Sequence, residues 1–238
     1  MIKELIWDSS LLKKKIGELE RVPVKSAQLV SAIEKARADG FQYLVCKLQA
    51  PEPRDIRTLE AADFYLTDIG VTLKITADNF GYSRAECTEA FRYIETASIL
   101  DVQKLKDMSI SLFTHSRFYS DPFYSRNEAD ALYQAWIENS VKGVVADAVF
   151  FIPGAGFITC KKNSTAQTGE IALLGIKKKS RSKGHGTALL DKAMRWFRTH
   201  DVSEVDVRTQ LRNMEAVNFY IKSGFFLKGY DQVYGKII

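Results

Sequence analysis

The chain has 238 residues, of which 46% are hydrophobic and 26% are charged, and its formal net charge is +5. A chain of this size can bury a proper core as one large domain or two modest ones, and its composition excludes a disordered tail. No apolar run approaches the roughly 20 residues of a membrane-spanning helix, and the first residues lack the basic-then-apolar order of a signal peptide. We therefore expect a cytoplasmic protein that has no membrane partner.

Cysteine and histidine are sparse and scattered. The residues concerned are Cys46, Cys87, Cys160, His115, His185 and His200. An odd set of distant cysteines without a C-x-x-C pair argues against a disulfide scaffold and against a structural zinc site. We predict three reduced thiols and no metal.

The first 90 residues predict a small α/β segment. Apolar periodicity favours helices over 26–38 and 55–62, and strands over 43–48 and 63–67. The polar stretch 77–89 is the expected boundary. The chain is thus divided into an N-terminal α/β domain, residues 1–90, and a second domain, residues 91–238.

The second domain is expected to open with a strand at 91–97. Asp101 can cap a helix that follows, and an aromatic and polar loop spans 114–126. Asn127 can cap the next helix, for which Gly143 is a plausible end. Strands and helices then alternate, with strands at 148–152, 157–161 and 170–176, a helix at 184–199, a strand at 205–209, a helix at 213–223, and one or two closing strands in 225–238.

A basic loop joins the strand at 170–176 to the helix at 184–199. It reads Arg181-Ser182-Lys183-Gly184-His185-Gly186, and with Lys177-Lys178-Lys179 it places five cations in seven positions, 177–183. A helix N-terminus presents unpaired N–H groups and partial positive charge, and glycines let an anion approach closely. The loop therefore favours a pyrophosphate site. A glycine-rich turn with a solvated basic rim is the alternative that the loop alone leaves open.

A second motif begins about 30 residues downstream. Asn213 is a good helix cap, and Tyr220 taken alone is an amphipathic core tyrosine. Together the two stretches resemble the GNAT superfamily of N-acetyltransferases. In that family an Arg/Gln-x-x-Gly-x-Gly/Ala loop opens the helix that binds coenzyme A, and an Asn-x-x-Ala-x-x-x-Tyr-x-x-x-Gly-Phe stretch follows. The matching residues are Arg181, Gly184, Gly186, Asn213, Ala216, Tyr220, Gly224 and Phe225.

The resemblance covers roughly residues 91–238 and implies an α/β fold of the α+β type. We expect a central mixed, mostly antiparallel sheet flanked by helices, plus the smaller N-terminal segment. It also implies acetyl-CoA, or another short acyl-CoA, as co-substrate. The expected coenzyme contacts are Leu174, Ile176, Arg181, Ser182, Lys183, Gly184, His185, Gly186, Thr187 and Asn213. Ser182 departs from the usual glycine and His185 from the usual aliphatic residue, but neither change removes a backbone N–H donor.

The implied reaction is direct attack of an amine on the acyl-CoA thioester, because no cysteine occupies a motif position. Tyr220 would protonate the leaving thiolate, since a phenol of pKa about 10 stays protonated at neutral pH. The base is open. Glu170, at the start of the coenzyme strand, is the tentative candidate beside His115, Glu138 and bulk water.

Three further stretches resemble the bacterial TDP-fucosamine acetyltransferase branch of the superfamily. They are Ser116-Arg117-Phe118-Tyr119 with Tyr124, the stretch 133–143, and the stretch 207–213. This resemblance implies a dTDP-linked amino-deoxysugar as acceptor, used in the synthesis of lipopolysaccharide or another surface polysaccharide, with the N-terminal domain on the sugar-nucleotide side. Aromatic rings can stack on thymine and arginine can pair with phosphate. The candidates are Arg117, Tyr119, Tyr124, Trp136 and Arg208; a core role is the better interpretation of Trp136.

Two other functions remain open on the sequence. One is a GNAT enzyme that acts on a protein lysine or another small amine, such as an aminoglycoside. The other is a basic nucleic-acid-binding module, which salt-sensitive binding to random DNA would reveal; we expect no nucleic-acid partner because the lysines lead into the phosphate loop. A homodimer is one possible assembly. The amino position on the sugar and the acyl length are not fixed by the sequence.

Overall fold

The computed structural model describes residues 2–22, 26–81 and 89–238. The strands are β1 (Ile2–Glu4), β2 (Ile16–Leu19), β3 (Tyr43–Gln49), β4 (Tyr65–Thr76), β5 (Glu95–Thr96), β6 (Ala148–Ile152), β7 (Gly156–Asn163), β8 (Thr168–Ile176), β9 (Glu204–Gln210) and β10 (Phe226–Ile237). The helices are α1 (Ile6–Leu12), α2 (Ser26–Ala38), α3 (Pro53–Glu60), α4 (Glu89–Arg92), α5 (Val102–Ser109), α6 (Arg117–Ser120), α7 (Arg126–Val141), α8 (His185–Arg198) and α9 (Met214–Lys222). A 3₁₀ turn, η4 (Lys178–Ser180), precedes α8.

The described strands form one sheet in the order β1-β2-β3-β10-β4-β9-β8-β7-β6-β5. The β2–β3 and β8–β9 pairs are parallel, and the other neighbours are antiparallel. The expected mixed, mostly antiparallel sheet is therefore confirmed.

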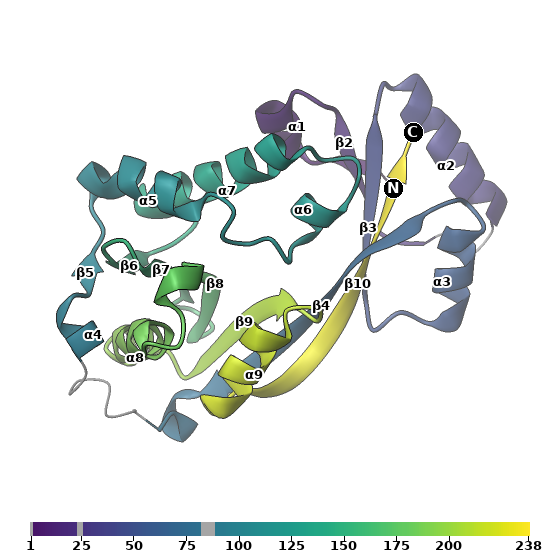
Figure 1. Ribbon diagram of the computed structural model, residues 1–238. Helices are drawn as coiled ribbons and strands as arrows, with labels where there is room; N and C mark the ends of the chain where they lie inside the picture. Colours follow the sequence, from purple (N-terminus) through teal and green to yellow (C-terminus); the bar gives the residue numbers. More distant parts are fainter. Residues whose placement is uncertain (1, 23–25, 82–88) are drawn as a thin grey trace.

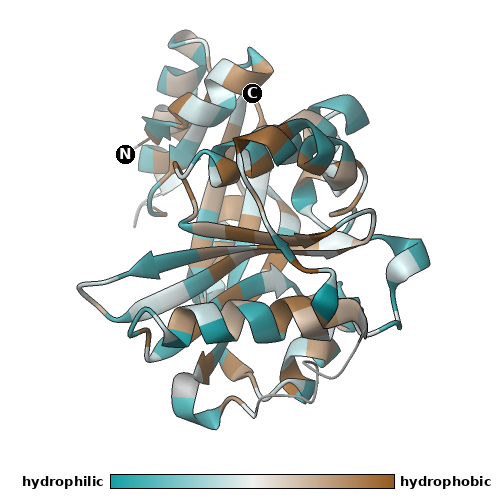
Figure 2. Ribbon diagram, turned by 90° about the vertical axis from the view of Figure 1, so that its left-hand side faces the viewer, coloured by the Kyte–Doolittle hydropathy of each residue, from teal (hydrophilic) through white to brown (hydrophobic). Residues whose placement is uncertain are grey.

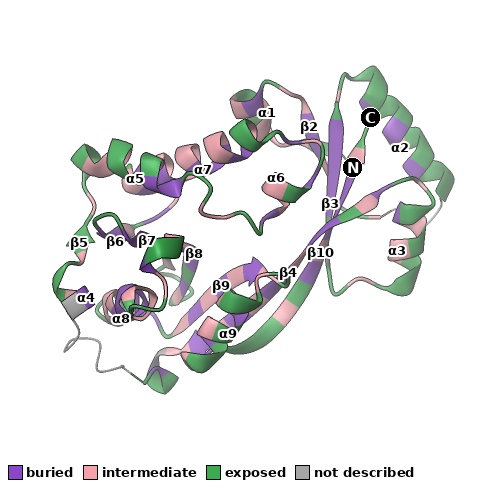
Figure 3. Ribbon diagram, in the orientation of Figure 1, coloured by how far each residue is buried: buried purple, intermediate pink, exposed green. Residues whose placement is uncertain are grey.

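Helices cover both faces of this twisted sheet (Figure 1). Side chains alternate along each strand, so neighbouring residues serve opposite layers. Val149 and Phe151 pack under α5 and α7, whereas Phe150 and Ile152 face α8. Val45 belongs with the α1 and α6–α7 side, while Leu44 and Cys46 face α2 and α3. Figure 3 shows the buried residues along the strands and the exposed outer sides of α2 and α3, and Figure 2 shows hydrophobic colour concentrated toward the sheet.

The expected strand at 91–97 is wrong in its first half, because α4 occupies Glu89–Arg92 and only Glu95–Thr96 pair with β6. The cap of α7 also differs. Ser125, not Asn127, accepts a hydrogen bond from Glu128 N, and Glu128 accepts one from Ser125 N. This reciprocal capping box satisfies two backbone donors, which outweighs the capping preference of asparagine. Helix α6 interrupts the expected loop at 114–126, and β1, α1 and β2 were not expected.

Strand β4 comes from the predicted N-terminal domain, yet it lies between β10 and β9 in the sheet. Val71 pairs with Thr209 on one side and with Tyr230 on the other. Sheet hydrogen bonds thus cross the predicted division at residue 90, and the division into domains 1–90 and 91–238 stays a prediction. Residues 82–88 of the expected boundary, including Cys87, lie outside the described residues.

Cys46 and Cys160 are buried free thiols, and burial raises the pKa of each above its ordinary value. In residues 2–22, 26–81 and 89–238, no helix is long and apolar enough to cross a bilayer. The same residues hold no cluster of His, Cys, Asp and Glu side chains placed for a metal ion.

Candidate active site

Strands β8 and β9 separate at the centre of the sheet. They pair only from Thr168 with Glu204 to Ile171 with Val207, although β8 continues to Ile176. A bulge accompanies the separation, because Thr159 of β7 faces Leu173 while Cys160 faces Ile171. Leu173 N donates to the Thr159 hydroxyl at 3.0 Å. The β9-facing backbone edge of β8 is therefore free of a strand partner beyond the bulge.

A cleft of about 840 Å³ occupies this opening. It extends from the N-terminus of α8 along β8 and β9, and it continues to residues of β2, β3, β4 and β10. Tyr220 of α9 and Trp136 of α7 line it from opposite layers. The other sequence-predicted residues that line it are Glu170, Leu174, Ile176, Arg181, Ser182, Gly184, His185, Gly186, Thr187, Asn213, Arg117 and Arg208, whereas Lys183, Tyr119 and Tyr124 lie outside its lining.

The phosphate loop ends in a ring of free backbone donors. Ala188 N makes the first helical hydrogen bond, to Gly184 O at 2.9 Å. The N–H groups of His185, Gly186 and Thr187 have no backbone acceptor in the described part of the chain. These donors and the helix dipole point toward the cleft end of α8, which suits an anion.

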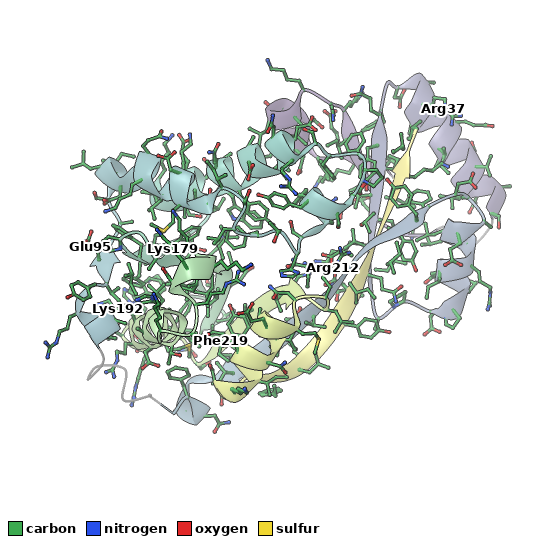
Figure 4. The ribbon with its side chains drawn as sticks, in the orientation of Figure 1. Arg37, Glu95, Lys179, Lys192, Arg212 and Phe219 are labelled. Carbon is green, nitrogen blue, oxygen red and sulfur yellow. The ribbon has the colours of Figure 1, made fainter. Side chains whose placement is uncertain are left out.

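The loop's two glycines have different reasons to be there. Gly184 has φ +78°, and Ser182, which replaces the family's glycine, has φ +58°. These are left-handed conformations that favour glycine. At Gly186, a β-carbon would lie 3.6 Å from Phe219, an ordinary contact. Phe219 of α9 is labelled in Figure 4, where it lies toward α8. The protein's own packing therefore does not require glycine at 186.

Side-chain hydrogen bonds fix the loop. Arg181 Nε donates to Ile176 O at 3.2 Å, and its Nη1 donates to Glu215 at 2.8 Å. His185 Nδ1 lies 2.9 Å from Ser180 O, which assigns its proton to Nδ1. Local bonds thus hold Arg181 and His185, whereas Lys178, Lys179 and Lys183 are exposed.

Tyr220 is a buried tyrosine whose ring meets the rings of Phe219 and Phe225 edge-on, at centroid distances of 5.2 and 5.3 Å. Burial, with a smaller contribution from Cys160, raises its pKa above the ordinary value. Its hydroxyl makes no hydrogen bond to the described residues, so it stays protonated and available at the cleft. Asn213 caps α9 as expected, since its Oδ1 accepts from Ala216 N at 3.2 Å.

The candidate general bases differ in their position relative to the cleft. Glu170 and His115 are exposed and line the cleft. Glu138 lies outside the lining and forms ion pairs with Lys106, at 2.7 Å, and with Lys142. Hydrogen bonds from these two lysines lower its pKa to about 2. Glu138 was therefore a wrong candidate, because so weak a base cannot take a proton near neutral pH.

The aromatic candidates for the acceptor side are mostly held by other side chains. Tyr119 donates to Asp130 at 2.6 Å. The Tyr124 hydroxyl accepts from Arg117 Nη1 at 3.2 Å. Trp136 is half-buried and stacks on Tyr133, with ring centroids 6.1 Å apart. Arg117 and Trp136 thus face the cleft, and Tyr124 orients Arg117 from behind it.

Arg208 crosses the face of the sheet. It leaves β9, passes over Gly70 of β4 and donates to both oxygens of Asp231 on β10, at 2.7 and 2.6 Å. A β-carbon at position 70 would overlap its guanidinium. Lys47 Nζ lies 3.9 Å from Asp231. Arg208 therefore already has a carboxylate partner, and a substrate phosphate would compete with Asp231 for it.

On strands β2 to β4, sequence reasoning missed three charged residues of the lining, which are Glu18, Lys47 and Asp68. Strand register unites two of them, since Val233 of β10 pairs with Lys47 on one side and with Asp68 on the other. No local spacing connects them. The available signal was a charged residue that follows an apolar run, as at Lys47 in β3.

Known proteins share these features. A model of the acetyltransferase (GNAT) family matches residues 111–225. A dTDP-fucosamine acetyltransferase of Escherichia coli O6:H1 is 26% identical over 183 residues, covering 75% of this chain and 74% of that protein. Streptothricin acetyltransferase A of Bacillus subtilis is 30% identical over 123 residues, covering 50% of this chain and 67% of that protein.

The fold is shared with a solved GCN5-related N-acetyltransferase from Sphaerobacter thermophilus. Its TM-score is 0.59 at 14% identity, covering 89% of this chain and 66% of that chain. The separated strands, the anion-binding helix end and these matches agree. The chain belongs to the acetyltransferase (GNAT) family and is an acyl-CoA-dependent N-acyltransferase.

Proposed function

We propose that the protein transfers an acetyl or other short acyl group from acyl-CoA to the amino group of a dTDP-linked amino-deoxysugar, in the synthesis of a surface polysaccharide such as lipopolysaccharide. The observation that best supports this function is one continuous cleft. It runs from the N-terminus of α8, which suits an anion, to charged side chains on β2, β3 and β4. One end suits a coenzyme and the other a polar, charged acceptor. The dTDP-fucosamine acetyltransferase relative supports this acceptor class.

Backbone groups of α8 and β8 support the binding of coenzyme A at this end of the cleft. The free N–H groups of His185, Gly186 and Thr187 would hold the pyrophosphate. The unpaired edge of β8 at Leu174 and Ile176 would pair with the pantetheine amides, as a peptide adds to a sheet edge. A ligand against the backbone at position 186 gives the reason for glycine that internal packing does not give.

The chemistry is direct transfer. The amine nitrogen forms a bond to the acyl carbon, the carbon–sulfur bond breaks, and Tyr220 donates its proton to the leaving thiolate. The raised pKa of Tyr220 keeps that proton in place at neutral pH. The proton lost by the amine goes to Glu170, to His115 or to water. Cys160 is buried with a raised pKa, which gives no support to a thiolate intermediate.

On the acceptor side, Arg117 would pair with the nucleotide phosphates. Its guanidinium is already oriented by Tyr124 and lies 4.4 Å from the Phe118 ring centroid. Trp136 offers an aromatic face on which the nucleobase of the acceptor would stack. The N-terminal residues contribute β2, β3 and β4 to the cleft, which is why we assign residues 1–90 to the sugar-nucleotide side.

Mass spectrometry of the products from acetyl-CoA and a panel of dTDP-amino sugars tests the proposal. We expect one product heavier by an acetyl group, and less of it by about 10²-fold or more with Tyr220→Phe over the same time. Turnover of a lysine peptide or an aminoglycoside, with no turnover of any nucleotide-linked sugar, would establish the alternative acceptor class. The streptothricin acetyltransferase relative favours that second candidate.

A further inference from the structure

Asp68 has an unusual environment. It is 3% exposed and lines the cleft from β4. Its Oδ1 is buried and has no hydrogen-bond partner among the described residues. Its Oδ2 lies 3.9 Å from Arg208 Nη2, beyond hydrogen-bond distance. Leaving a buried carboxylate oxygen unpaired costs folding free energy, so the chain retains a destabilising feature at the edge of its active site.

The backbone holds this carboxylate in place. Val233 pairs with Asp68 but Tyr234 pairs with Leu66, so Thr67 is an extra residue that forms a bulge beside Asp68. The Thr67 hydroxyl donates to Val233 O at 2.9 Å. Arg212, labelled in Figure 4, donates to Thr67 O at 2.9 Å. Bulges of this kind re-aim a side chain and are frequent beside active sites.

The cations around Asp68 do not satisfy Oδ1. Arg208 gives its hydrogen bonds to Asp231, and Arg212 gives one to the backbone at Thr67. Lys47 lies nearest to Asp231. Burial raises the pKa of the Asp68 carboxyl, and the attraction of Arg208 and Arg212, a hydrogen bond from the Ile69 backbone and the charge of Arg117 offset this only in part. No side chain of the described residues donates a hydrogen bond to Oδ1, which is thus left for a donor from outside the chain.

Asp121 is the informative contrast within the same protein. It is also 3% exposed, but it lies outside the cleft lining. Its Oδ2 accepts from the Tyr43 hydroxyl. Its Oδ1 accepts from the Tyr65 hydroxyl at 2.9 Å and from Phe123 N at 3.0 Å. At Asp121, outside the cleft, the fold thus supplies partners for both oxygens.

We propose that Asp68 is an acceptor-binding residue, whose Oδ1 accepts a hydrogen bond from a donor on the acceptor, either its ammonium group or a sugar hydroxyl. The proposal rests on the acyl transfer to an amine argued above. It assigns a specificity role on the acceptor side of the cleft. Proton removal stays with the groups already named.

Kinetics of Asp68→Asn test this role. We expect KM for the acceptor to rise about 10- to 100-fold, the loss of one hydrogen bond to a charged group, with kcat and KM for acyl-CoA unchanged. A rise near 100-fold identifies an ammonium partner, because an ion pair is then lost together with the hydrogen bond. A rise near tenfold identifies a hydroxyl. An unchanged KM would overturn the proposal.

Glu204→Gln is the matched kinetic control. Glu204 pairs with Lys74 at the far end of β9 and lies outside the cleft lining. The substitution removes a carboxylate charge from the same sheet and leaves the residues of the acceptor side unchanged. An equal rise of the acceptor KM in this variant would mean that general charge, rather than Asp68, controls binding, and would also overturn the proposal.

Thermal unfolding gives a second test that needs no acceptor. Asp68→Asn removes a buried charge whose Oδ1 has no hydrogen-bond partner among the described residues, so its Tm should equal or exceed that of the wild type, while Asp121→Asn should lower Tm. A clear fall of Tm in Asp68→Asn would show a structural role and overturn the proposal.

Failure of the proposed function is distinguishable from failure of this inference. If the wild type acetylates another primary amine but no nucleotide-linked sugar, the sugar-nucleotide function falls. The kinetics of Asp68→Asn are then measured with that amine. A rise in the KM for the amine, with kcat and the KM for acyl-CoA unchanged, decides the role of Asp68 independently of the sugar-nucleotide function. If no amine is turned over, the two Tm shifts decide it.

Discussion

The two ends of the cleft are built from different material. The proposed coenzyme end consists of backbone groups of one continuous stretch, residues 172–187, which contains the free edge of β8 and the N-terminus of α8. The proposed acceptor end consists of charged side chains from separate elements, such as Lys47, Asp68 and Arg117. Backbone N–H groups suit a pyrophosphate that every acyl-CoA carries. Fixed charges in a partly buried site can distinguish one acceptor from another.

The two ends also differ in the kind of destabilising feature that each contains. At the coenzyme end the constraint is conformational, with left-handed residues at Ser182 and Gly184. At the acceptor end the constraint is electrostatic, with an Arg208–Asp231 pair beside Asp68, one of whose carboxylate oxygens has no hydrogen-bond partner among the described residues. We therefore expect substitutions at the two ends to alter different kinetic constants. Substitution of Tyr220, the proposed proton donor, should alter turnover itself.

Tyr220→Phe gives the largest expected effect. It removes the proton donor and keeps the packing with Phe219 and Phe225, so kcat should fall by about 10²-fold or more while KM for acyl-CoA changes little. Steady-state kinetics with saturating acceptor measure this. Tyr119→Phe is the control, because its hydroxyl is bonded to Asp130 outside the cleft lining. Near-normal turnover in Tyr220→Phe would end the assignment.

Gly70→Ala should disable the acceptor end. Its β-carbon would displace the Arg208 guanidinium from Asp231, whose side chain is 1% exposed. Separating a buried ion pair costs up to about 3–5 kcal/mol, and the nearby Lys47 should reduce this. We expect lower Tm and a rise of about tenfold or more in the acceptor KM, with the Kd for acyl-CoA unchanged.

Gly229→Ala serves as the control for that substitution, since a β-carbon at 229 in β10 would meet no atom within 4 Å. Isothermal titration with coenzyme A and kinetics with the acceptor are run on both variants. Equal behaviour of the two would show that the Arg208–Asp231 pair does not shape the acceptor end.

The same contrast explains what the sequence predicted. The helix at 26–38 and the strand at 148–152 match α2 and β6, because each carries a local pattern of sufficient length. The coenzyme end was predicted for the same reason, since its residues are contiguous and its motif is local. The acceptor end depends on register between strands distant in sequence, as in the pairing of Lys47 and Asp68 with Val233. No single window of sequence contains that information.

Short elements were the other failure. Strand β1 has 3 residues and β2 has 4, too few for alternation to stand out. Segment 91–97 shows the reverse error, because its short alternation predicted a strand where α4 forms a helical turn. Both errors follow from tertiary packing that overrides weak local preference.

Gly186→Ala and Gly184→Ala divide ligand contact from backbone strain at the coenzyme end. At 186 the new methyl meets only ordinary contacts within the protein, so Tm should hold while the Kd for acyl-CoA rises about tenfold through steric conflict with the pyrophosphate. At 184 the positive φ opposes alanine, so stability should fall by about 1 kcal/mol. Calorimetric titration and thermal unfolding measure both. An unchanged Kd for acyl-CoA in Gly186→Ala would show that the pyrophosphate does not bind at the N-terminus of α8.

Glu138→Gln gives the smallest expected effect and tests whether charge outside the cleft matters. Glu138 accepts hydrogen bonds from Lys106 and Lys142, which lower its pKa from 4.5 to about 2. A depressed folded-state pKa contributes stability that is present above the unfolded pKa and is lost as pH falls through the folded one. Because the side chain is 27% exposed, solvent screening limits the gain to about 0.5–1 kcal/mol. Urea unfolding should show the variant weaker by that amount at pH 7, with the difference shrinking between pH 4.5 and about 2, as the wild-type carboxylate takes up its proton. Turnover and both KM values should match the wild type, since a carboxylate held by two lysines outside the cleft neither binds the acceptor nor takes its proton. A rise in either KM would mean that the acceptor end reaches along α7 beyond Trp136.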